Sequence, residues 1–219
     1  MTTKFFGVNE HGRFDKNLAQ AQFHTHVQNI LKKHDEATKE LKEGGSKWYE
    51  KAHEEAKKVG SGDVRKGAGI IAALSPLTDW DRNVQQAHEM KKTGYVSNAL
   101  IPQNVEKAHR IMAGEDPHEV LGGHKVRSFF ENIHDPSNPE HVTVDRHAYD
   151  IAMGHPFVGT GRKTTPRGGG GKMSPDIGLS ALGRYQHFVQ AYKHASQELG
   201  EPVPNKTQAI SWVAHRGAL

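Results

Sequence analysis

Two short stretches in the middle of the chain carry the residues best placed to do chemistry. In the first, a glycine turn at Gly122-Gly123 leads into an expected helix with Lys125 in its first turn. In the second, residues 141–144 are expected to be extended and to deliver Asp145 to the start of another helix. Two helix N-termini with free backbone N–H groups would then converge on one point. Such a point attracts a phosphate or a developing negative charge.

Lys125 and Asp145 would supply complementary groups at this point. A lysine amine becomes a nucleophile when burial or neighbouring cations favour its neutral form. A carboxylate can shuttle protons or stabilise an oxocarbenium-like centre. Each residue also has an ordinary interpretation, Lys125 as a solvated helix residue and Asp145 as an N-cap that contributes about 1 kcal/mol. The pairing of the two, rather than either alone, indicates a site.

The pattern resembles the helix-hairpin-helix DNA glycosylase superfamily, in particular its 8-oxoguanine glycosylase type. The segment Gly123-His-Lys-Val126 is similar to the Gly-x-Lys-Val at the end of that family's hairpin, and Val144-Asp-Arg-His147 is similar to the Val-Asp-x-His that follows. The two key residues, Lys125 and Asp145, lie 20 residues apart. The resemblance covers about residues 67–154. It implies that Lys125 forms a Schiff base with the sugar after base loss, and that Asp145 assists cleavage of the glycosidic bond.

The same resemblance implies DNA as the partner and no cofactor. Candidate nucleic-acid contacts lie at the hairpin and at the second helix start: Gly122, Gly123, His124, Arg127, Arg146 and His147. Upstream, Ile70–Ala87 is similar to the helix that lines the family's base pocket, and the candidate pocket residues are Ser75, Trp80 and Asn83. Trp80 can stack a flipped base. Asp79, Trp80 and Asn83 are explained equally well by a helix cap followed by core packing.

The expected function is therefore an enzyme that excises or modifies a flipped base in DNA. The alternative keeps the fold without catalysis, as a DNA-binding or host-partner-binding accessory protein. Several short motifs are also similar to an uncharacterised family found in bacteriophages: Ala73-Leu-Ser-Pro76, Arg82-Asn83, Val144-Asp-Arg-His147 and Gln208-Ala-x-x-Trp212. That similarity implies a phage protein in the cytoplasm of a bacterial host, with base hypermodification as a variant of the enzyme.

Histidine is abundant, with 16 residues, which raises the question of a metal site. His24 and His26 are two positions apart on an expected helix and point to nearly opposite sides, so they cannot share an ion. His141 and His147 could flank Asp145, but no third ligand has a characteristic spacing. We therefore expect no metal.

Composition narrows the class of protein. The chain has no cysteine, which excludes disulfides, thiolate catalysis and cysteine-ligated metal centres. No apolar run reaches the roughly 20 residues of a membrane span, and residues 1–7 lack the apolar part of a signal peptide, so a soluble cytoplasmic protein is expected. The net charge of +4 suits a polyanionic partner, although many proteins with a similar charge bind none.

Hydrophobic periodicity predicts an all-α fold in one domain, residues 1–219. Expected helices run over Lys16–Glu43, Lys47–Val59 and Lys125–Ile133, and others begin at the caps Asp63, Asp79 and Asp145 or at Pro102 and Pro117. The stretch Gly67–Leu74 is apolar on every side, which predicts a central helix whose small residues allow close neighbours. Residues 158–175 are rich in glycine and basic residues, and we expect a flexible loop there. Further helices are expected over residues 178–216, with Asn205 capping the last.

Overall fold

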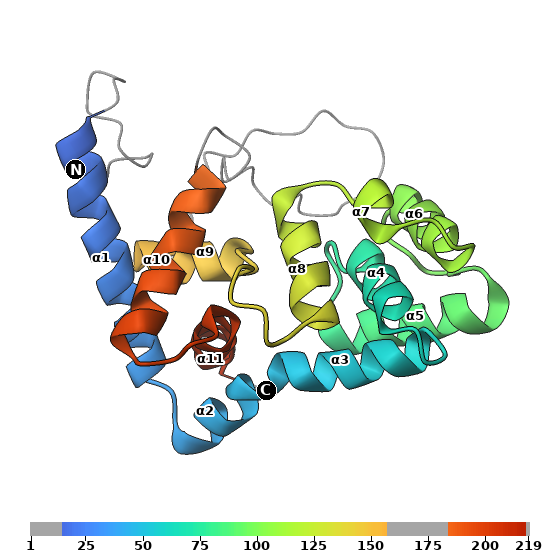
Figure 1. Ribbon diagram of the computed structural model, residues 1–219, viewed down its shortest axis with the longest axis horizontal. Helices are drawn as coiled ribbons and strands as arrows, with labels where there is room; N and C mark the ends of the chain where they lie inside the picture. The colour runs from blue at the N-terminus through green and yellow to red at the C-terminus, as the bar shows by residue number, and fades with distance from the viewer. Residues whose placement is uncertain (1–14, 157–183, 218–219) are drawn as a thin grey trace.

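A computed structural model of the protein describes residues 15–156 and 184–217, and this part of the chain is helical without any strand (Figure 1). The all-α prediction is confirmed. The helices are α1 Lys16–Asp35, α2 Lys39–Ser46, α3 Trp48–Val59, α4 Val64–Leu74, α5 Trp80–Thr93, α6 Pro102–Met112, α7 Pro117–Val120, α8 His124–His134, α9 Arg146–Met153, α10 Arg184–Glu198 and α11 Pro204–Arg216.

Side-chain caps start many of these helices, as the sequence predicts. The carboxylates of Asp63, Asp79 and Asp145 each accept a hydrogen bond from the backbone N–H three residues later. Such bonds satisfy N–H groups that have no partner inside the helix. The predicted cap at Asn205 is wrong, because α11 already begins at Pro204 and the Asn205 amide donates to the Pro136 carbonyl at 2.9 Å.

The prediction of one long helix over Lys16–Glu43 is also wrong. The chain leaves α1 after Asp35, and α2 begins at Lys39, where the Thr38 hydroxyl accepts a hydrogen bond from the Leu41 N–H. Ala37 is buried at the bend. Apolar residues continue at helical spacing across this bend, so periodicity alone does not reveal that the helix changes direction.

A first hydrophobic core surrounds α4, as predicted for Gly67–Leu74, and all eight of those residues are buried. Helices α3, α5, α6 and α8 pack around α4 (Figure 1). The small residues bring backbones close together, because a Cβ added at Gly67 would lie 1.8 Å from the Ala56 carbonyl oxygen of α3. The α3–α4 contact therefore requires glycine at position 67.

A second hydrophobic core joins the two ends of the described chain. Residues of α1, α9 and α10 form it, including Val27, Ile30, Phe188 and Tyr192. Helix α11 packs against α1, α9 and α10 and also against α2 and α3, and its Ala209 belongs to the first core (Figure 1). The chain thus places its middle helices in one core and its outer helices in another, with α11 between them. The sequence did not predict this division.

The segment that leads to Asp145 is extended, as predicted, and side chains replace the strand partner that it lacks. The Tyr185 hydroxyl donates to the Val142 carbonyl at 3.0 Å and accepts from the Val144 N–H at 3.1 Å. The Asn132 amide contacts the Thr143 hydroxyl at 2.9 Å. The two Tyr185 bonds satisfy buried backbone groups, and together with the Asn132–Thr143 contact they fix the segment before Asp145 relative to α8 and α10.

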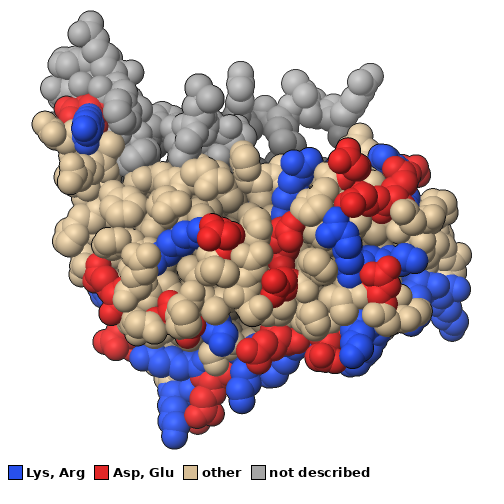
Figure 2. Space-filling view, in the orientation of Figure 1, with Lys and Arg blue, Asp and Glu red and all other residues tan. Residues whose placement is uncertain are grey.

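Charged residues do not form a single basic face in the view of Figure 2. Lys and Arg side chains gather along the lower edge and the right-hand end, mixed with Asp and Glu (Figure 2). No helix in the described ranges is both long and apolar enough to cross a membrane. The predicted glycine-rich loop at residues 158–175 lies outside the described residues.

Candidate functional site

The predicted hairpin exists as a short helix, a turn and a longer helix. Helix α7 ends at Val120, and the chain turns through Leu121–Gly123 into α8. Gly123 has φ +78°, a left-handed conformation that favours glycine. Because its N-cap is glycine, α8 starts without a side-chain hydrogen bond to its first N–H groups. Uncapped N–H groups at a helix start are a typical place for an anion to bind.

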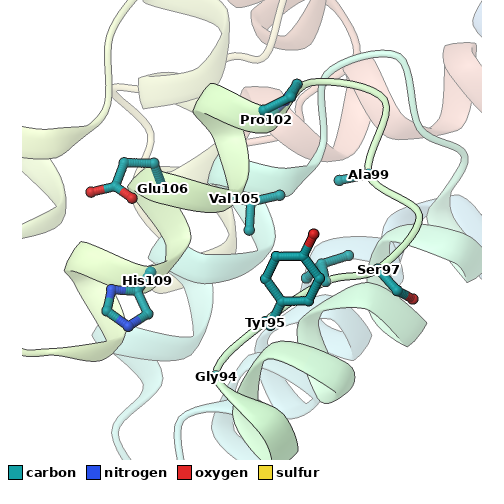
Figure 3. A pocket seen from close by; sticks show the side chains of 9 residues that line it. Gly94, Tyr95, Ser97, Ala99, Pro102, Val105, Glu106 and His109 are labelled. Atoms are coloured by element: carbon teal, nitrogen blue, oxygen red, sulfur yellow. The ribbon is translucent and has the colours of Figure 1, made fainter.

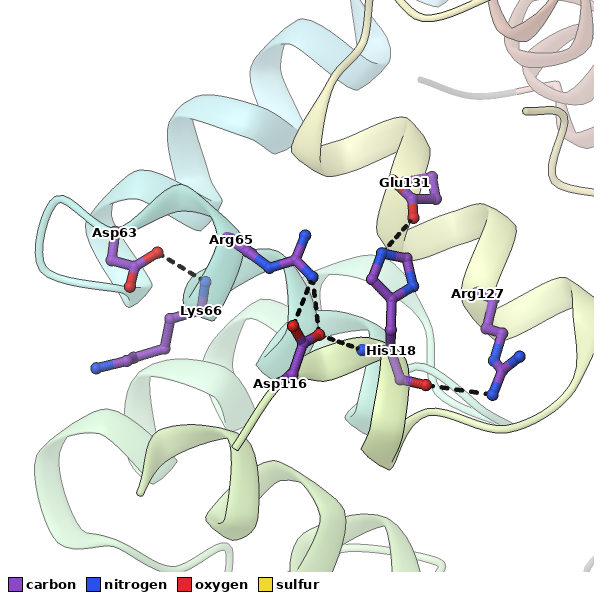
Figure 4. Close-up of polar contacts among 7 residues, drawn as sticks. All are labelled: Asp63, Arg65, Lys66, Asp116, His118, Arg127 and Glu131. Atoms are coloured by element: carbon purple, nitrogen blue, oxygen red, sulfur yellow. Dashed lines mark hydrogen bonds and ion pairs between the residues drawn. The ribbon is translucent and has the colours of Figure 1, made fainter. Parts of the chain in front are cut away.

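Arg127 braces this turn from within α8 (Figure 4). Its Nε donates to the Leu121 carbonyl at 2.8 Å. Its guanidinium also donates to the His118 carbonyl at 3.2 Å, the contact drawn in Figure 4. The carbonyls at the end of α7 are thereby satisfied by a side chain that enters from the next helix. Arg127 is exposed, and its predicted contact with a phosphate stays a prediction. The two hydrogen bonds show that its guanidinium also stabilises the hairpin.

Further polar contacts fix the hairpin to the first core (Figure 4). The Arg65 guanidinium of α4 donates to both oxygens of Asp116, at 2.7 and 3.0 Å, just before α7 begins. The His118 ring lies 3.0 Å from the Glu131 carboxylate of α8. These contacts join α7 to α4 at its beginning and to the second half of α8 through His118.

Asp145 has two hydrogen bonds, one local and one distant. Its Oδ1 accepts from the Ala148 N–H at 2.8 Å, which is the N-cap bond expected from the sequence. Its Oδ2 accepts from the Trp212 indole N–H of α11 at 3.1 Å. The carboxylate is partly exposed. Asp145 therefore has the ordinary role of a cap and is also held by an aromatic side chain that the sequence analysis did not assign to the site.

Two residues close to Lys125 on α8, His124 and Phe129, contact aromatic side chains of other helices. The His124 ring stacks on Tyr185 at 5.2 Å, so it meets the residue that holds the segment before Asp145. Phe129, one helical turn after Lys125, lies 6.1 Å from the Trp48 ring. Lys125 is partly exposed, and no described residue gives its amine a hydrogen bond or an ion pair. Lys125 therefore shares with Phe129 the side of α8 that meets Trp48.

Four aromatic side chains form a continuous series, here called the aromatic layer: Trp48, Trp80, Phe129 and Trp212. Trp48 is central, with ring centres 4.8 Å from Trp80 and 6.5 Å from Trp212. All four side chains are partly exposed. The layer begins at the predicted base-pocket residue Trp80 and ends at the residue that holds Asp145. The layer therefore connects the predicted pocket residue Trp80 to the predicted catalytic residue Asp145, which no sequence pattern links.

The other predicted base-pocket residues are turned into the protein. The Ser75 hydroxyl donates to the Ala72 carbonyl, and the Asn83 amide donates to the Ile71 carbonyl, each at 3.0 Å. Both side chains are buried. Both side chains therefore satisfy backbone carbonyls in the last turn of α4. Of the three predicted pocket residues, only Trp80 is partly exposed.

The predicted residues after Asp145 differ in their surroundings. Arg146 is exposed, whereas the His147 ring is partly buried and lies 6.0 Å from Trp212 and 5.4 Å from His215. Burial lowers the pKa of the His147 imidazole below its ordinary value, against the raising effect of the Asp145 carboxylate. His147 is therefore a neutral ring at neutral pH.

A separate hollow of about 430 Å³ lies between the end of α5 and the start of α6 (Figure 3). It is lined by Gly94, Tyr95, Val96, Ser97, Ala99, Pro102, Val105, Glu106 and His109. None of the predicted site residues lines it. The hollow is therefore separate from the candidate site.

The fold and the site together define an all-helical protein in which one hairpin carries a lysine and a neighbouring helix is capped by an aspartate bound to tryptophan. Within that class, the chain belongs to DUF7178, described as a family of unknown function, which matches residues 14–219. Comparison with curated proteins and with solved structures gave no match.

Proposed function

We propose that the protein is a helix-hairpin-helix glycosylase-like enzyme that acts on an extruded nucleotide of DNA, by base excision or base modification. The observation that carries the proposal is the placement of the Asp145 carboxylate at one end of a partly exposed aromatic layer, beside the helix that bears Lys125. Extruded bases are bound by stacking on aromatic side chains, next to the groups that react with them.

Each group has a distinct task in this proposal. The neutral Lys125 amine attacks the anomeric carbon of the sugar as the N-glycosidic bond breaks, and the base leaves with the bonding electrons and the proton that the amine gives up. Opening of the sugar ring then leaves a Schiff base on Lys125, which borohydride reduces. Asp145 stabilises the positive charge that develops on the sugar ring. Trp48 and Trp80 stack the base, and the uncapped N–H groups of α8 bind a backbone phosphate.

The first test is covalent trapping with borohydride on oligonucleotides that carry modified bases. We expect an adduct with the unaltered protein and none with Lys125→Ala. The matched control is Lys66→Ala, because Lys66 is also a partly exposed lysine in the first turn of a helix, α4. An adduct that persists in Lys125→Ala would remove the proposed role of this lysine.

The second test separates the chemical role of Asp145 from its role as a cap. Asn caps helices as well as Asp does, so Asp145→Asn keeps the fold and loses the charge. Asp79→Asn is the matched control, since Asp79 also caps its helix by accepting from the N–H three residues on. We expect base release or trapping to fall at least about 100-fold in Asp145→Asn and to be unchanged in Asp79→Asn.

Duplex binding at two salt concentrations tests the partner itself. Phosphate contacts release counterions, so we expect the affinity for DNA to fall steeply between about 50 and 200 mM salt. Equal binding at both concentrations contradicts a DNA partner. Salt-dependent binding without base release or trapping on any substrate indicates a non-catalytic DNA-binding module.

A further inference from the structure

Two ligand-type side chains lie one turn apart on α9. His147 and Asp150 are separated by three residues, so they project from the same side of the helix. His215 of α11 faces them, and one donor atom from each of the three residues lies within 4.8 Å of the other two. No local spacing pattern links His215 to His147, because the two residues are 68 positions apart.

The donor set is chemically suited to a metal ion. Two imidazole nitrogens and one carboxylate oxygen are the donors that first-row divalent transition metals prefer. In a tetrahedral site with bonds of about 2.1 Å, donor atoms lie about 3.4 Å apart. The present spacing therefore closes onto an ion with side-chain movements of about 1 Å. Three protein ligands leave at least one coordination position open.

One of the donor residues has an unsatisfied nitrogen. The Nδ1 atom of His147 is buried and has no hydrogen-bond partner among the described residues. A buried polar atom without a partner is costly, and a bound ion or water is one of the explanations that such atoms have in folded proteins. Asp150 is only 7% exposed, so the carboxylate lies inside the protein rather than on a solvated acidic surface.

The charges around the cluster include both signs. The nearby Asp145 and Asp150 carboxylates favour a cation, and the Arg146 and Arg216 guanidinium groups oppose it. Arg216 lies over the Trp212 ring, 5.1 Å from the ring centre. Two carboxylates therefore offset two guanidinium groups, and an ion depends on direct coordination rather than on a general negative field.

We propose that His147, Asp150 and His215 bind one first-row divalent transition-metal ion, such as Zn²⁺, Fe²⁺ or Mn²⁺, with an open coordination position. The site is independent of the proposed glycosylase chemistry, because it uses neither Lys125 nor Asp145 as a ligand. It links α9 to α11, the helices that bear Asp145 and Trp212.

The experiment measures metal binding directly, on full-length protein without a histidine tag, stripped with a chelator. Zn²⁺ binding is titrated by calorimetry, and Co²⁺ is used as a probe because its visible absorption reports coordination number. Fe²⁺ and Mn²⁺ binding are measured by anaerobic dialysis and metal analysis. We expect one ion per chain, with binding weakened at least about tenfold in His215→Ala and in Asp150→Asn.

The matched control is His118→Ala, which removes another histidine beside a carboxylate, Glu131 of α8, away from the proposed site. This variant is expected to bind the ion as the unaltered chain does. His215 is partly exposed, so its replacement tests the site even where Asp150→Asn fails to fold by circular dichroism. No uptake of any of the ions at about 1 mM, or equal binding in His215→Ala and the unaltered chain, overturns the proposal.

Discussion

At the scale of single residues, Trp212 determines how the Asp145 carboxylate is presented. One carboxylate oxygen is used by the helix cap and the other by the indole N–H. A carboxylate with both oxygens bound has a fixed plane and a fixed direction. Hydrogen bonds to charged groups contribute about 1.5–3 kcal/mol where they are shielded from water, and less at a partly exposed site such as this one.

Trp212→Phe tests this arrangement because it keeps an aromatic ring and removes the N–H donor. We expect the free energy of unfolding to fall by about 1–2 kcal/mol, measured by urea denaturation followed by circular dichroism. Trp48→Phe is the control, since the described residues give the Trp48 indole no hydrogen bond to a carboxylate. An equal loss in both variants would mean that ring volume, not the bond to Asp145, is what matters.

Local residue roles were predictable, and distant ones were not. The Asp145 cap follows from a short polar side chain before a helix, and all its atoms lie within a few residues. The bond to Trp212 joins positions 67 residues apart, and no local pattern specifies it. Asn83 was a pocket candidate for a similar reason, because its partner is the Ile71 carbonyl, 12 positions away on α4. The Ser75 partner, the Ala72 carbonyl, is local, but a polar residue after a helix does not by itself reveal whether its side chain turns back onto that helix.

At the scale of helices, the α3–α4 contact depends on the absence of a side chain. The Cβ of alanine at position 67 would lie 1.8 Å from a backbone oxygen of α3, and backbone cannot move aside as a flexible side chain can. The whole helix would have to shift. This affects the site, because α3 begins with Trp48 and α4 packs against α8.

Gly67→Ala is therefore expected to lower the free energy of unfolding by about 3 kcal/mol or more, despite the better helix propensity of alanine. Thermal or urea denaturation measures the loss. Gly122→Ala is the control, because a Cβ there would meet nothing within 4 Å. We expect that variant to change stability by less than about 1 kcal/mol. A stabilised Gly67→Ala protein would contradict the close packing of these helices.

At the scale of the whole molecule, we expect the two cores to differ in their response to acid. In the second core, the His26 Nδ1 of α1 lies 2.8 Å from the His187 Nε2 of α10. Burial lowers the pKa of His26 to about 4, and burial with the neighbouring His26 lowers the pKa of His187 to about 3. Their unfolded value is 6.5. The unfolded chain therefore takes up protons below pH 6.5 that the folded core excludes.

Stability from these histidines is present above pH 6.5 and is lost as the pH falls toward 4 and then 3. With a discount for the partial exposure of His187, we expect a loss on the order of 2 kcal/mol between pH 7 and pH 5. Hydrogen exchange followed at both pH values should show α1 and α10 losing protection before α4. His26→Gln should flatten the pH dependence, and an unchanged slope would assign it to other groups.

The division into two cores marks the limit of what sequence periodicity reveals. Periodicity predicts that α4 is central, because all its sides are apolar. Periodicity does not tell which helices share a core. Helices α1 and α10, which carry Val27 and Phe188, have one apolar side just as the outer helices of the first core do. The packing of α1 against α10 and α11 joins segments that are far apart in the sequence, and local patterns do not specify such contacts.

The aromatic layer has a practical consequence for any study of this protein. The chain has three tryptophans, and all three belong to that layer at the junction of the cores. Emission excited selectively from indole therefore originates entirely at the place where a base or an ion is proposed to bind. The protein carries its own optical reporter, and a substance that enters the junction should alter its brightness or wavelength without any attached dye.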